Sequence, residues 1–164
     1  MSEAEGGWLR RAGHLDLGGG ETVLWSVAEG RRGRRWRSMR RHADGGLLSD
    51  LLLEVDPAGR WTRLELATTA GILTLHPDAD GRAAHGNVVT ARGVVPLACA
   101  WSPRHRLVVD GEPVAAVALA ALGHATPTPG VVVGADLAVT TEDAILAPEG
   151  SPDGLPGPSW PLEE

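Results

Sequence analysis

Residues 47–75, LLSDLLLEVDPAGRWTRLELATTAGILTL, decide the fold, because they predict three consecutive antiparallel strands around two tight turns. Before the first turn, Leu51, Leu53 and Val55 alternate with Leu52, Glu54 and Asp56. After it, Trp61, Arg63 and Glu65 alternate with Thr62, Leu64 and Leu66. A period of two is the spacing of strands, whose successive side chains point to opposite faces.

The turns in this stretch have residues suited to sharp reversals. Asp56-Pro57-Ala58-Gly59 combines an Asp that can bond the turn backbone, a Pro that fixes φ, and a Gly that accepts positive φ. A second reversal at 69–71 leads into Ile72-Leu73-Thr74-Leu75, and a third follows at 77–81. The sequence therefore predicts a meander of short strands.

Outward from the meander, β-rich runs separated by Gly, Pro and Asp recur along the chain. We expect further strands at 22–27, 34–40, 85–90, 93–101, 106–109, 131–133 and 136–140. Residues 113–122 are ambiguous, since Pro at the first position and many Ala favour a helix while Val at 114 and 117 is compatible with a strand. The predicted fold class is all-β: a curved antiparallel sheet forming a roll or open barrel, with one short helix at 113–122 as an option.

Composition predicts one domain, residues 20–147, preceded by a flexible lead at 1–19 with a glycine hinge and followed by a Pro- and Gly-rich acidic tail at 148–164. The chain of 164 residues has no apolar run long enough to span a bilayer and no secretory leader pattern, so we expect a cytoplasmic protein. Its single cysteine, Cys99, lies in an apolar strand-like run and is expected to pack as a small hydrophobe.

The basic run 31–41, RRGRRWRSMRR, holds seven of the 15 basic residues. It could meet phosphates, with Trp36 stacking on a base. The rest of the chain, however, has eight arginines against 21 carboxylates, a net charge of −13 that would repel a polyanion. A solvated strand whose arginines pair with acidic neighbours is therefore preferred over a nucleic-acid site.

Catalytic and cofactor motifs are not evident. His76, His85 and His105 fall near turns without a metal-ligand spacing, and the chain has neither a G-x-S-x-G elbow nor a phosphate-binding glycine loop. We expect no metal and no cofactor. An enzyme that uses His85 or His105 as an acid or base stays an alternative.

Tryptophan carries all of the aromatic chemistry, because the chain has six Trp and no Phe or Tyr. Trp25, Trp36, Trp61 and Trp101 each fall in an expected strand. Core packing is the simplest role, but a curved sheet could gather some of them on a concave face that holds an acyl chain or a sugar ring.

The order of segments resembles the glycolipid-binding family, whose members look like the lipoprotein-carrier fold. The similar pieces are Val23-Leu24-Trp25, the basic strand around Trp36, residues 53–63, the Leu-Thr-Leu strand with its Asp-x-Asp-Gly turn, Ser102-Pro103, and a late strand at 135–139. The family's Asp-rich strand leading into Thr-Asn-Thr-Leu-Pro is absent here, where residues 99–107 read CAWSPRHRL. The resemblance implies an open barrel with an apolar concave face, and it favours a strand at 113–122.

These observations lead to a first hypothesis of a non-enzymatic protein that binds a lipid or glycolipid-like amphipathic ligand. The candidate ligand-binding residues are Trp25, Arg35, Trp36, Arg37, Trp61, Trp101, His85 and His105. Arg35, Arg37 or Arg40 would meet a polar or anionic headgroup at a rim. The alternatives are a small hydrolase or isomerase using His85 or His105, and a protein-interaction or assembly module that uses an exposed strand edge. The oligomeric state is left open.

Overall fold

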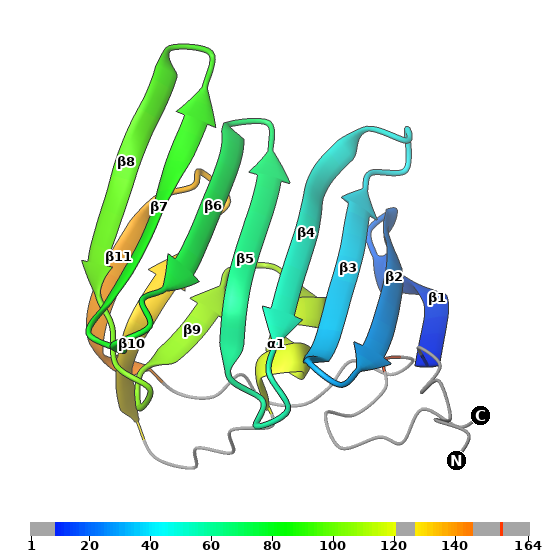
Figure 1. The fold of residues 1–164 in the computed structure, drawn as a ribbon. Coiled ribbons are helices and arrows are strands. Elements are labelled where there is room, and N and C mark those ends of the chain that lie inside the picture. The colour runs from blue at the N-terminus through cyan, green and yellow to red at the C-terminus, as the bar shows by residue number, and fades with distance from the viewer. Residues whose placement is uncertain (1–8, 121–126, 146–154, 156–164) are drawn as a thin grey trace, which may run out of the picture.

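The computed structural model describes residues 9–120, 127–145 and 155, and this part of the chain forms eleven strands and one helix (Figure 1). Eight strands make one sheet in which every strand pairs antiparallel with the next in sequence. Their bounds are β1 Leu9–Gly18, β2 Glu21–Gly30, β3 Gly33–Arg41, β4 Leu47–Val55, β5 Trp61–Thr68, β6 Gly71–Pro77, β7 Ala83–Thr90 and β8 Gly93–Ala100. The predicted meander at 47–75 is thus confirmed and forms the middle of a longer one.

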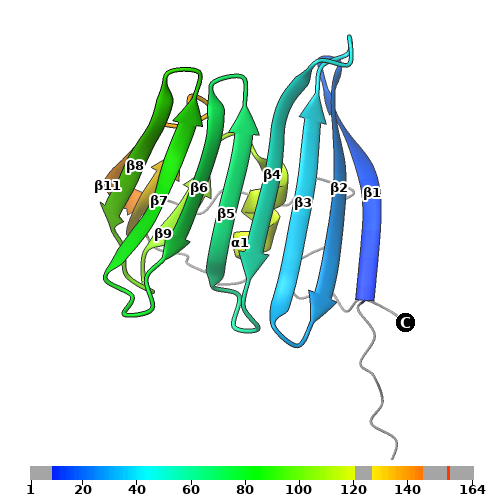
Figure 2. The ribbon, with the colours of Figure 1, turned by 45° about the horizontal axis from the view of Figure 1, so that its top comes forward.

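A second, smaller sheet and the helix cover one face of the large sheet (Figures 1 and 2). The small sheet has the order β11-β10-β9, built from β9 Arg106–Val109, β10 Thr128–Val133 and β11 Val139–Ile145. Strands β9 and β10 run parallel, and helix α1, Pro113–Leu119, lies in the connection between them. Parallel neighbours need a crossover connection, and α1 forms part of it.

The covered face of the large sheet, called the inner face here, carries the core. Alternate residues such as Leu51, Leu53, Leu64 and Leu73 are completely buried there, together with the helix residues Val114 and Val117. Helix α1 packs on β3, β4 and β9. The opposite face, the outer face, has no described element packed on it (Figure 2). An all-β architecture with an open antiparallel sheet is confirmed, and neither sheet closes on itself.

Residues 113–119 form a helix, so the preference for a strand at 113–122 is wrong within the described residues. Pro113 occupies the first turn, where its missing N–H costs nothing. Val114, Ala115, Val117 and Ala118 are buried, a spacing that gives a helix one apolar stripe. The valines that were compatible with a strand are the residues that anchor the helix.

Trp61 lies on the inner face, although strict alternation placed it on the face of Arg63. Glu54 pairs with Arg63 while Val55 pairs with Trp61, which leaves Thr62 as an extra residue, a β-bulge. The hydroxyl of Thr62 donates a hydrogen bond to the carbonyl of Glu54, at 3.3 Å. The bulge reverses the alternation for one residue and buries the indole of Trp61 to 3% exposure.

Two further expectations differ from the structure. Residues 9–18, which the sequence assigned to a flexible lead, form the edge strand β1. Only Leu15 of this strand is buried, so the strand is held by its backbone ladder with β2 and lacks the apolar alternation that would have predicted it. Residues 135–138, expected to begin a strand, form a loop in which Leu137 has φ of 65° and the carboxylate of Asp136 accepts a bond from the amide of Ala138. The tail at 148–164, apart from residue 155, lies outside the described residues.

Candidate functional site

A pocket of about 240 Å³ lies at one end of the large sheet, between two hairpin turns and the helix. Its lining comes from residues 29–36 around the β2–β3 turn, from residues 55–59 around the β4–β5 turn, and from Ala118 of α1. The three segments are distant in sequence, so the pocket exists only in the folded chain.

Glycine and aspartate shape both turns of the pocket. Gly33 has φ of 110°, and a Cβ built on it would lie 2.0 Å from the carbonyl oxygen of Val55, so only glycine allows this approach of the two hairpins. In the second turn, Oδ1 of Asp56 accepts bonds from the amides of Ala58 and Arg60, each at 2.9 Å. Gly59 closes that turn with φ of 82°.

The pocket combines an apolar wall with paired charges. Trp36, Val55 and Ala118 are all buried and present carbon surface. Glu29 and Arg34 also line it and form an ion pair with an Oε2–Nη2 distance of 3.0 Å. Because the two charges neutralise each other, the site offers hydrogen-bonding groups beside an apolar surface without a strong field.

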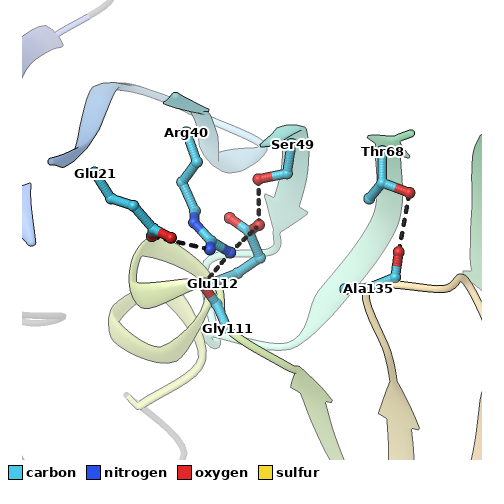
Figure 3. Close-up of polar contacts among 7 residues, drawn as sticks. All are labelled: Glu21, Arg40, Ser49, Thr68, Gly111, Glu112 and Ala135. Carbon is cyan, nitrogen blue, oxygen red and sulfur yellow. Dashed lines mark hydrogen bonds and ion pairs between the residues drawn. The ribbon is translucent and has the colours of Figure 1, made fainter. Parts of the chain in front are cut away.

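A buried polar cluster lies on the inner face near the start of α1 (Figure 3). Arg40 donates from Nη1 to Oε1 of Glu112 at 3.2 Å and to the carbonyl of Gly111 at 2.6 Å, and its Nη2 reaches Glu21 at 3.3 Å. Ser49 donates to the same Oε1 of Glu112. Glu112 is buried and Arg40 largely so, so these bonds hold the β9–α1 connection on strands β2, β3 and β4.

Burial raises the pKa of the Glu112 carboxyl above its ordinary value of 4.5, and desolvation is the largest cause. The hydrogen bond from Ser49 and the charge of Arg40 act in the opposite direction. No described residue bonds to Oε2 of Glu112.

The four candidate tryptophans are core residues, and they do not meet at one site. Trp25, Trp36, Trp61 and Trp101 are between 1% and 8% exposed. Only Trp36 lines the pocket. Trp61 and Trp101 meet edge to face with ring centroids 5.0 Å apart, and His105 packs on Trp101 in the same way at 5.7 Å.

Arg35 and Arg37 lie on the outer face, opposite to Trp36, and therefore cannot form a rim with it. Arg35 pairs with Glu54 at 2.7 Å, and Arg37 lies 3.9 Å from Asp50. Arg34 and Arg40 are likewise paired with carboxylates. The basic run thus consists largely of cross-strand ion pairs, as a solvated strand would.

His85 lies on the outer face, where its Nδ1 is 2.6 Å from Oδ1 of Asp78. Its register partner on β6 is His76. This histidine and carboxylate do meet, but both side chains are open to solvent, at 48% and 33% exposure, and neither lines the pocket. His85 and His105 lie in different surroundings and form no common site.

Sequence reasoning missed Glu29, Arg34 and Ala118 in the pocket, and Ser49 and Glu112 in the buried cluster. Pro113 was a usable signal for a helix start directly after Glu112, because Pro is favoured at the first helical position, but it did not indicate that Glu112 is buried. Nothing local marks the other four, since their roles depend on partners distant in the chain.

Searches among the described residues find no group of three His, Cys, Asp or Glu side chains arranged to hold a metal ion. No helix in the same residues is long and apolar enough to cross a membrane. Comparison of the chain with family models, curated proteins and solved structures finds no match.

Proposed function

We propose that this protein binds part of a small amphipathic molecule, of the lipid or glycolipid-like class, in the pocket at Trp36. The observation that carries the proposal is the combination of an indole wall with a polar, charge-paired lining in one cavity. Ligand sites are typically concave and mostly apolar, with a few polar groups that orient the ligand. The proposal involves binding and no catalysis.

The lining suggests how such a molecule would lie. Its apolar part would contact Trp36, Val55 and Ala118, and its polar part would bond Glu29, Arg34 or the backbone of residues 57–59. The pocket's three charged groups, with Asp56 included, sum to −1. This favours an uncharged polar group over an anionic one.

Size limits what the pocket can hold. At about 240 Å³ it lies just below the roughly 300 Å³ at which pockets for drug-sized ligands begin. It would therefore enclose one acyl end or one ring, while the remainder of the ligand stays outside.

The test adds bulk to the pocket without touching the core. Ala58 is an exposed turn residue that lines the pocket, so Ala58→Leu should occlude it and leave the fold intact. Isothermal titration calorimetry with alkyl glucosides of increasing chain length, below micelle formation, should show binding to the wild type. The variant should bind at least about tenfold more weakly, a change of roughly 1.4 kcal/mol.

Ala79→Leu is the matched control, because Ala79 is exposed in an equivalent Asp-x-x-Gly turn between β6 and β7 and does not line the pocket. It should bind like the wild type. If no alkyl glucoside binds the wild type, or if both variants bind equally well, the pocket is not the site.

A further inference from the structure

The two ends of the large sheet differ in chemistry. In this meander the β1–β2, β3–β4, β5–β6 and β7–β8 turns all lie at one end, the upper end in Figure 1. We call this the tip end, and it comprises the turns 18–20, 42–46, 69–70 and 91–92. The other three turns, 31–32, 56–60 and 78–82, lie at the opposite end, and the first two of them border the pocket.

Every large hydrophobic side chain that is exposed in the described part of the chain lies near the tip end. These are Leu17, Leu24, Leu47, Ile72, Val89, Val94 and Val95, with exposures from 38% to 63%. Leu47 begins β4, Ile72 is the second residue of β6, and Val89 is the penultimate residue of β7. The distribution is therefore directional and is not the scattered exposure of single apolar residues that any surface shows.

The register aligns several of these side chains in one row across the outer face. Leu24 pairs with Met39 on β3, and the row continues through Asp50 and Ala67 to Ile72, Val89 and Val94. With strands about 4.8 Å apart, Leu17 on β1 and Val94 on β8 are separated by roughly 34 Å. The apolar residues thus follow the tip end along the whole sheet.

Charge is distributed in the opposite sense. The tip-end turns contain one carboxylate, Asp44, and one guanidinium, Arg92. Six of their other residues are small: Gly18, Gly19, Gly20, Ala43, Gly45 and Gly46. The turns at the other end contain seven charged residues: Arg31, Arg32, Asp56, Arg60, Asp78, Asp80 and Arg82. Asp16, Glu21, Arg40, Arg41 and Asp50 lie on the strand ends that flank the tip-end turns, so the tip end carries charges of both signs that nearly balance.

From this geometry we infer that the tip end docks the protein on a neutral lipid surface. The apolar residues belong to separate hairpins and to both faces, since Val94 is on the outer face and Val95, which pairs with Val88, is on the inner face. A deformable apolar medium can contact all of these tips together. Binding to lipid interfaces scales with the apolar area buried.

A protein partner fits this surface less well. Ile72, Val89 and Val94 form the largest group of exposed aliphatics adjacent through the register. The other exposed aliphatics lie on different hairpins or, like Val95, on the opposite face, so they do not form one contiguous patch for a rigid partner. The balance of charge at the tip end favours the lipid surface, because a zwitterionic lipid surface then meets no excess of like charge. The pocket lies at the opposite end of the sheet, so the docked protein would hold it away from the lipid. None of the pocket residues is used in the docking argument, which is therefore independent of the proposed function.

The test is co-sedimentation of the full chain with phosphatidylcholine vesicles. We expect the wild type to sediment with the vesicles, and Ile72→Thr, Val94→Thr and Val95→Thr combined to lower the partition coefficient at least about tenfold. Threonine keeps the β-branched shape that strands favour, so the sheet should persist. Raising the salt concentration should leave wild-type binding unchanged, because no net charge drives it.

Two more variants make the outcome decisive. Ala98→Thr with Ala100→Thr changes exposed positions of β8 at its other end and should bind like the wild type. The double variant Leu24→Thr with Leu47→Thr changes exposed residues on two other strands and should also weaken binding. It replaces the triple variant in the test if the triple variant loses the wild-type thermal transition. A wild type that stays in the supernatant, or variants that bind equally well, would overturn the inference. So would a vesicle-free dimer that the triple variant loses, since a second copy would then occupy the surface.

Discussion

The inner and outer faces of the large sheet use the same strands for different purposes. Leu53 and Leu52 are neighbours on β4, yet Leu53 is fully buried under the second layer while Leu52 is half-buried on the open face. The adjacent outer positions hold cross-strand pairs such as Arg35 with Glu54. Residue type alone therefore does not predict energetic weight; the face on which a residue lies does.

The arginines of β3 repeat this contrast. Arg40 turns inward, is 17% exposed, and bonds Glu21, Glu112 and the carbonyl of Gly111. Arg35 turns outward, is 59% exposed, and pairs with Glu54 in solvent. Solvent screens the second pair far more than the first, so the same side chain should matter more on the inner face.

The largest expected effect tests the two leucines. Leu53→Ala should lower the free energy of unfolding by about 2–5 kcal/mol, because it removes buried methyl groups and leaves a cavity. Leu52→Ala should cost less than about half of that, since its side chain is partly in water already. Urea denaturation of both variants measures the difference, and equal losses would contradict the assignment of faces.

A second, smaller effect concerns the arginines. Arg40→Ala should cost about 2–3 kcal/mol, below the roughly 3–5 kcal/mol of a fully buried pair because Arg40 keeps some exposure. Arg35→Ala should cost less than about 1 kcal/mol. Thermal and urea unfolding of the two variants provide the comparison, and a cost for Arg35→Ala that equals or exceeds that of Arg40→Ala would refute it.

A compensating change sharpens this result. Arg40→Met combined with Glu112→Gln should be more stable than Arg40→Met alone, because the buried carboxylate of Glu112 is then no longer left without its partner. Glu21 keeps its charge in both variants, and its side chain is 31% exposed. If the double variant is no more stable than Arg40→Met, the unpaired carboxylate of Glu112 is not the source of the loss.

The smallest effect is a pH dependence centred on Glu112. Because burial raises the pKa of Glu112, the folded protein binds this proton more tightly than the unfolded chain. The stability it contributes is complete below about pH 4.5 and is lost as the pH rises through the higher folded pKa. Arg40 and Glu21 are the charged neighbours of Glu112 in the cluster. The Glu112→Gln variant lacks the titrating carboxyl, so the free energy of unfolding of the variant relative to the wild type should increase with pH. Parallel urea midpoints across the pH range would contradict the prediction.

Local pattern was enough to predict much of the large sheet. The three strands within 47–75, the Asp56-Pro57-Ala58-Gly59 turn and the strand around Trp36 all lie where the sequence predicted them, and Trp61 alone departs from the predicted alternation of β5. The candidate site was less predictable: of eight residues named for ligand binding, Trp36 alone lines the pocket. Alternation along one strand could separate Arg35 from Trp36 by face, but it could not show which face the second layer covers.

Three features needed the folded chain. The bulge at Thr62 buries Trp61 against the pattern of its own strand, because pairing with β4 allows an extra residue there. Pro113 and the alanines allow a helix at 113–119, but only the parallel pairing of β10 with β9 shows that this segment lies in a crossover connection packed on the large sheet. The pocket and the Arg40–Glu112 cluster join residues more than 50 positions apart.

The sequence by itself determined the period of two, the tight turns and hence an antiparallel meander, because these depend on interactions between near neighbours in the chain. Tertiary structure decided which face is buried, where the pocket lies and which arginine loses its solvent, because burial depends on what packs on each face. It also gathered the exposed aliphatics of the separate hairpins at one end of the sheet, since only the strand register places them in one row.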